Sequence, residues 1–75
     1  MNQKEFLSRL ADTLDRDDTI EADQSVELIQ EWDSLGILSV IGLLIDLDLK
    51  VDPMTIREIK NISQLLEIVK PTIHE

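Results

Sequence analysis

The amino-acid sequence predicts an all-α fold: a four-helix bundle with a short third helix and a long loop between its first two helices. Apolar residues recur at helical spacing along the chain, and no alternating pattern typical of a strand persists. Side chains that cap helix N-termini precede the apolar segments; they are Asn2, Asp33, Asp52 and Asn61. At 75 residues the chain has room for a single domain, residues 1–75.

The first helix is expected at residues 3–15. Asn2 and Glu5 have the spacing of a capping box. The apolar residues that follow fall on one helical face; they are Phe6, Leu7, Leu10, Ala11 and Leu14.

The stretch that follows, residues 15–33, is acidic and poorly periodic, and it is longer than loops in compact domains usually are. Such a loop needs apolar anchors to the core, and we expect a short helical turn around residues 26–30. The predicted anchors are Ile20, Val26, Leu28 and Ile29.

The second helix is expected to begin at Ser34, with Asp33 as its N-cap and Trp32 packed on Ile37 as a hydrophobic staple. Apolar residues then cover more than half of the helix circumference, which predicts a helix mostly enclosed by others. These residues are Leu38, Val40, Ile41, Leu43, Leu44, Ile45 and Leu47.

Two short helices complete the predicted bundle. Asp52 as N-cap and Pro53 as first helical residue open a third helix that extends to about residue 58. Asn61 and Gln64 form a second capping-box spacing ahead of the last helix, which Pro71 ends.

Both glycines of the chain lie inside the second helix, where each costs roughly 0.5 to 1 kcal/mol relative to alanine. Gly42 is as well explained by drift in a tolerant helix as by a functional need. Gly36 lies next to Ser34, where a missing side chain would let an enzyme or a bulky substituent approach the backbone closely.

The composition restricts the function. Sixteen acidic residues against seven basic ones give a net charge of −9, which disfavours binding to nucleic acid and anionic lipid and favours electropositive protein partners. The absence of cysteine excludes disulfides and indicates a reducing, cytoplasmic environment. No signal-peptide pattern is recognised, and acidic residues interrupt the longest apolar run, so we expect no membrane insertion.

Motifs for independent catalysis or a metal centre are incomplete. The acidic loop starts like a calcium-binding loop, but Ile20 and Val26 stand where a glycine and a bidentate glutamate belong. The single histidine, His74, lies in the tail and offers no base for a nucleophilic serine. No phosphate-binding glycine loop is present. The sequence therefore predicts a protein that is not an enzyme and holds no metal.

A small motif gives the most specific indication. The letters DSLG, Asp33 to Gly36, stand at the head of the second of four predicted helices in a small acidic chain, and this arrangement resembles the acyl carrier protein family. The ending IKNISQLLEIV is similar to the last helix of that family, so the resemblance covers essentially the whole chain. The form with tryptophan before and glycine after the motif is most similar to standalone carriers, and the fold it implies is an acyl-carrier-like bundle.

The resemblance implies a covalent cofactor. A phosphopantetheinyl transferase would attach 4'-phosphopantetheine from coenzyme A to Ser34, and Asp33 would help to position the metal and the coenzyme in that enzyme. The arm would carry an acyl, aminoacyl or polyketide intermediate as a thioester, received from a loading ligase and passed to downstream transferases or synthases. Fatty acid, polyketide, aminoacyl and D-alanyl cargo all stay open, and a monomer is expected. The implied cofactor-binding residues are Ser34, Asp33, Leu35 and Gly36.

The chain departs from the commonest family pattern, which has Asp-Ser-Leu-Asp and a glutamate-rich second helix. Here the second helix is apolar, so partner recognition is expected to depend on apolar contact with acids at the rim. The implied docking residues are Leu35, Ser39, Ile45, Asp46, Asp52 and Glu58.

Two other classes of function stay open as alternatives. An acidic helical adaptor would bind partners through its side chains without any prosthetic group, and intact mass after exposure to a transferase and coenzyme A separates it from a carrier. A small regulatory metal-binding protein would need calcium binding that the loop spacing does not predict.

Overall fold

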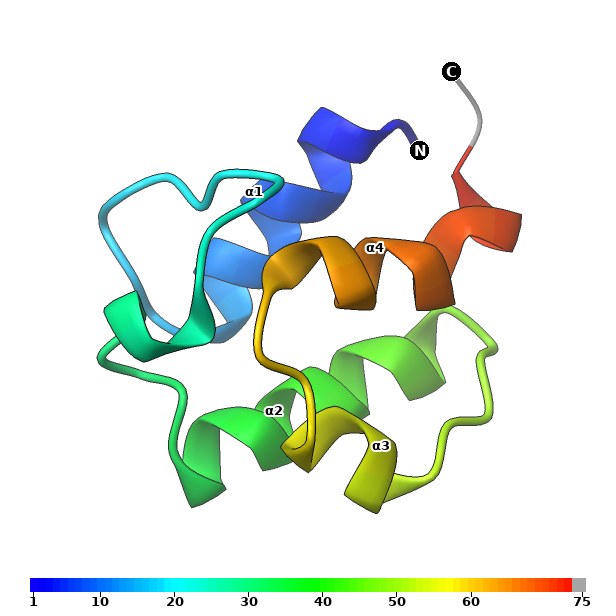
Figure 1. The fold of residues 1–75 in the computed structure, drawn as a ribbon. Helices are drawn as coiled ribbons and strands as arrows, with labels where there is room; N and C mark the ends of the chain where they lie inside the picture. Colours follow the sequence, from blue (N-terminus) through cyan, green and yellow to red (C-terminus); the bar gives the residue numbers. More distant parts are fainter. Residues whose placement is uncertain (74–75) are drawn as a thin grey trace.

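The computed structural model describes residues 1–73, and within them the chain is all-helical and contains no strand, as predicted (Figure 1). Four helices are compatible with a bundle; one short 3-10 turn lies in the loop between the first two helices, and a second follows the last helix. In chain order the elements are α1 (Gln3–Thr13), η1 (Val26–Leu28), α2 (Ser34–Asp46), α3 (Pro53–Arg57), α4 (Ile62–Val69) and η2 (Lys70–Thr72).

The core lies between the helices, with α2 packed against both α1 and α3. Figure 1 shows α3 running beside α2, and the long loop between α1 and α2 forming one flank of the molecule. The largest side chains that are fully buried come from all four α-helices; they are Phe6, Leu10, Leu44, Ile56, Ile62, Leu65, Val40 and Val69. A single apolar core therefore holds the elements together.

Helix α1 starts as predicted, because the Asn2 side chain accepts a hydrogen bond from the Glu5 backbone N–H at 2.8 Å. It ends at Thr13 rather than at residue 15. The reason is that Asp15 adopts the left-handed conformation, with φ of 54°, and the Arg16 N–H donates back to the Ala11 carbonyl at 2.9 Å. This pattern ends the helix and turns the chain into the loop.

The loop is anchored much as predicted, with one correction. Ile20, Val26 and Ile29 are buried, but Leu28 is 71% exposed, so its assignment as an anchor was wrong. In the 3-10 turn η1, residues three apart lie on the same side. Val26 and Ile29 therefore share the inner side of the turn, and Leu28 lies on another.

Backbone hydrogen bonds also tie the loop to the connection between α3 and α4. The Val26 N–H donates to the Lys60 carbonyl at 3.1 Å, and the Ile62 N–H donates to the Gln24 carbonyl at 2.9 Å. The Asn61 side-chain amide adds a bond to the Asp23 carbonyl at 2.8 Å. These bonds fix the path of a long segment that contains only one short 3-10 turn.

Helix α2 is less enclosed than predicted. Its inner side buries Val40, Leu43 and Leu44, but Leu38 is 63% exposed and Ile45 65% exposed. The expectation of a mostly enclosed helix was wrong, because its neighbours α1 and α3 leave an apolar outer side of α2 uncovered.

Helix α2 ends in the same way as α1. Asp48 takes the left-handed conformation, with φ of 62°, and the Leu49 N–H donates to the Leu44 carbonyl at 2.9 Å. Aspartates thus occupy both of these left-handed positions, where glycine is the usual residue.

The last two helices follow their capping residues. The Asp52 side chain accepts from the Met54 N–H at 2.9 Å at the start of α3, which ends at Arg57. The predicted capping box of α4 is confirmed, because the Gln64 side chain accepts from the Asn61 N–H at 3.1 Å while Asn61 caps the helix. Helix α4 ends just before the turn that contains Pro71, and His74 lies outside the described residues.

Candidate functional site

Ser34 is exposed and is the first residue of α2, as predicted. Asp33 before it has an extended backbone, and its carboxylate oxygen Oδ1 accepts from the Gly36 N–H at 2.9 Å. The helix is therefore capped by Asp33, and the cap makes no use of the Ser34 hydroxyl. That hydroxyl is available to a reagent from solution.

The first turn of α2 also contains backbone N–H groups that can donate hydrogen bonds to a ligand. Asp33 already engages the N–H groups of Gly36 and Ile37, the latter through its backbone carbonyl at 2.8 Å. The N–H groups of Ser34 and Leu35 precede the hydrogen-bond ladder of the helix. A phosphate bound to the Ser34 oxygen would lie beside these donors and at the positive end of the helix dipole, so the residues present fit a phosphodiester.

An open hollow of about 230 Å³ lies between the end of α1 and the start of α2. Its walls combine the left-handed turn after α1, the end of the long loop and the first turns of α2. The lining residues are Thr13, Leu14, Asp15, Glu31, Asp33, Leu35, Gly36 and Ser39. Both neighbours of Ser34 therefore border the hollow.

Gly36 requires a correction. It is buried, and the Glu31 carbonyl oxygen occupies the space that a Cβ atom would need, with a Leu14 methyl carbon 3.1 Å from the same point. The expectation that this glycine leaves room for an approaching enzyme was wrong, because the protein's own loop fills that room. Gly42 differs, since a Cβ there would meet nothing within 4 Å.

One ion pair, which the sequence analysis missed, joins the two ends of the long loop. The guanidinium Nη1 of Arg16 lies 2.8 Å from Oε1 of Glu31, and the two side chains are 14% and 33% exposed. The Asp33 N–H donates to the Glu31 carbonyl at 2.9 Å, which links the ion pair to the start of α2. No periodicity connects residues at opposite ends of an irregular loop, so only their opposite charges could have indicated the contact.

The hydrogen bond from Arg16 lowers the pKa of Glu31, and the residue's own backbone and the Arg16 charge lower it further. A carboxyl whose pKa is lower in the folded state stabilises the fold above its unfolded pKa, and this contribution is lost as the pH falls through the folded value. We therefore expect Glu31→Gln to reduce the free energy of unfolding at neutral pH, and the difference from wild type to shrink in acid. Urea titrations of both proteins from pH 7 downward check this. A difference that stays constant in acid contradicts it.

The predicted docking residues are spread along the outer surface. Leu35 is 72% exposed, and Ile45, Asp46, Asp52 and Glu58 are also exposed. Ser39 is half-buried, and its hydroxyl donates to the Leu35 carbonyl at 3.1 Å.

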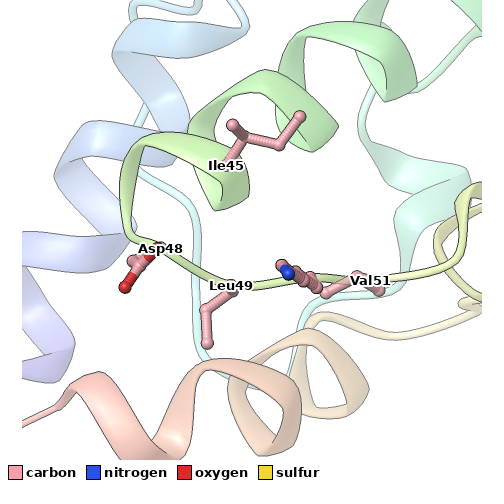
Figure 2. A pocket seen from close by; sticks show the side chains of 5 residues that line it. Ile45, Asp48, Leu49 and Val51 are labelled. Atoms are coloured by element: carbon pink, nitrogen blue, oxygen red, sulfur yellow. The ribbon is translucent and has the colours of Figure 1, made fainter.

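The structure brings only some of these docking residues together. Leu35 and Ser39 border the hollow beside Ser34. Ile45 instead borders a separate hollow of about 320 Å³ at the far end of α2, formed with the loop that follows the helix (Figure 2). Leu38 and Met54 are further exposed apolar residues, which the sequence analysis did not include among the docking residues. Leu38 lies one helical turn after Ser34 on the same face.

Comparisons with family models, with curated proteins and with solved structures find no match for this chain. None of the helices in residues 1–73 has the length and apolar character needed to cross a bilayer.

Proposed function

We propose that this protein is a standalone carrier of the acyl carrier type, which holds 4'-phosphopantetheine on Ser34. The main support is the position of Ser34: an exposed first residue of a helix whose cap is supplied by Asp33, within the DSLG motif. A short third helix and a long loop between the first two helices are the features expected of an acyl-carrier-like bundle.

The attachment step needs only the hydroxyl from this chain. The Ser34 oxygen attacks the phosphorus of coenzyme A that is joined to pantetheine, and the bond between that phosphorus and the bridging pyrophosphate oxygen breaks. Adenosine 3',5'-bisphosphate leaves with the electron pair, and the serine proton passes to a base of the transferase. Asp33 is exposed and uses one carboxylate oxygen for the helix cap, which supports a role for its carboxylate in holding the metal and coenzyme in that complex.

The arm supplies a thiol, on which a loading ligase places an acyl, aminoacyl or polyketide intermediate for downstream transferases or synthases. The chain itself has no cysteine. Its part is to present the arm and to be recognised by partner enzymes, so the protein is a carrier and not an enzyme. A cytoplasmic monomer that meets its partners by diffusion fits this role.

A thiol assay tests this function directly. The chain without the cofactor should give no thiol signal, because it lacks cysteine. After incubation with coenzyme A, magnesium and a broad-specificity phosphopantetheinyl transferase, followed by desalting, about one thiol per chain is expected. A protein that stays free of thiol with several transferases would support the adaptor alternative and overturn the carrier proposal.

Leu35→Asp is expected to leave the helical fold largely intact and to weaken both modification and downstream transfer. The side chain is 72% exposed and follows the attachment serine directly, so a charge there alters the surface that meets the transferase and not the core. Circular dichroism and modification kinetics measure the two effects.

Leu28→Asp is the matched control, because it adds the same charge at a leucine of equal exposure outside α2. Modification should be affected much less in this variant. Equal losses in both variants would show that added charge, and not the loss of a contact at Leu35, is responsible.

A further inference from the structure

Three residues that the structure brings together at the start of α2 have no part in the attachment step described above; we call Arg16, Glu31 and Gly36 the entry clip. Arg16 lies just after α1, Glu31 lies near the end of the long loop, and Gly36 is in the first turn of α2. The Arg16 guanidinium binds the Glu31 carboxylate at 2.8 Å, and the Glu31 carbonyl oxygen lies against Gly36 where a side chain would otherwise be.

The clip fixes the path of the chain just ahead of Ser34. The Glu31 carbonyl accepts from the Asp33 N–H at 2.9 Å, while the Asp33 side chain accepts from the Gly36 N–H at 2.9 Å. Ser34 lies between these two bonds. A displacement of Glu31 would therefore also displace Asp33 and the first turn of α2.

We infer that Arg16, Glu31 and Gly36 are positioning residues, which set the direction in which Ser34 is presented to the transferase. The inference rests on the proposed function. The reaction requires the serine oxygen to approach phosphorus in line with the leaving group, and small misplacements of a reacting atom cost large factors in rate. The clip acts through Asp33 and the first turn of α2.

Charge removal alone could also slow modification, because an acidic carrier is attracted to a basic enzyme. Glu27→Gln controls for this effect, since Glu27 is an exposed acid of the same loop outside the clip. A loss of attraction raises KM, whereas a misdirected serine lowers kcat. The two causes are therefore separable in the kinetics of the transferase.

The experiment measures kcat and KM for transfer from coenzyme A to wild type, Glu31→Gln, Arg16→Gln, Glu27→Gln and the charge swap Arg16→Glu with Glu31→Arg. We expect Glu31→Gln and Arg16→Gln to lower kcat by on the order of tenfold. The swap should recover most of the loss, and Glu27→Gln should change kcat by less than about twofold. Gly36→Ala, which forces the Glu31 carbonyl away, should lower kcat further if circular dichroism shows that it folds.

Backbone amide spectra supply a second readout. The amide signals of Ser34 to Ile37 should move in Glu31→Gln, return toward their wild-type positions in the swap, and stay in place in Glu27→Gln. Equal kcat values for Glu31→Gln and Glu27→Gln, or a swap that recovers nothing, would overturn the inference while leaving the carrier function intact. A wild-type chain that gains no phosphopantetheine would instead overturn the proposed function, and the inference with it.

Discussion

Replacing Phe6 with alanine is expected to leave most of the protein unfolded at room temperature. Phe6 is the only phenylalanine of the chain and is fully buried in the centre of the core. Removing a buried phenylalanine side chain costs about 3 to 5 kcal/mol, and a core of this size rarely supplies more than about 3 to 5 kcal/mol of net stability. Loss of the helical circular dichroism signal, and of a cooperative urea transition, would measure the effect.

Leu38→Ala is the matched control for Phe6→Ala. It also removes a large apolar side chain from a helix, but Leu38 is 63% exposed, so the free energy of unfolding should change by less than about 1 kcal/mol. If the two substitutions destabilise the protein equally, the assignment of core and surface is wrong.

The helix starts could be predicted because they depend on neighbouring residues. Asn2, Asp33, Asp52 and Asn61 each accept a backbone N–H within three residues of themselves. The ends of α1 and α2 were harder to predict, since Asp15 and Asp48 take the left-handed conformation, which is more typical of glycine.

Features that depend on distant parts of the chain were predicted less well. The exposure of Leu28 follows from how the η1 turn faces the core, and the exposure of Leu38 follows from which side of α2 meets α1 and α3. The ion pair between Arg16 and Glu31 joins residues that share no periodic pattern. Packing between elements determines these exposures and this ion pair, and a single sequence does not show that packing.

At the candidate site, the sequence placed Ser34, Asp33 and Leu35 correctly on the surface at the start of a helix. The motif and the capping rule act over a few residues, which is why they could be recognised. Gly36 was misinterpreted because a missing side chain looks the same in sequence whether it makes room for a partner or for the protein's own loop. Here the Glu31 carbonyl fills the space.

Ser34→Ala is expected to abolish attachment of phosphopantetheine without weakening the fold. The substitution removes one hydroxyl at an exposed first-turn position, and the cap is made by the Asp33 carboxylate, so the free energy of unfolding should change by less than about 0.5 kcal/mol. An adaptor that binds partners through many side chains would behave differently. In an adaptor, Ser34→Ala would leave the binding of partners nearly unchanged, because only one hydroxyl is lost.

Ser63→Ala is the matched control for the attachment site. Ser63 is also an exposed serine in the first turn of a helix with a polar N-cap, Asn61, but it lies outside the DSLG motif. Its replacement should leave attachment unchanged. If Ser63→Ala also lost the modification, the loss in Ser34→Ala would not identify Ser34 as the attachment site.

Intact-protein mass spectrometry of wild type, Ser34→Ala and Ser63→Ala, after incubation with coenzyme A, magnesium and a phosphopantetheinyl transferase, tests the carrier function most directly. Wild type and Ser63→Ala should each gain the mass of one phosphopantetheine, and Ser34→Ala should gain none. A modified Ser34→Ala variant, or a wild-type chain left unmodified by several transferases, would contradict the assignment of Ser34 as the attachment site of a carrier protein.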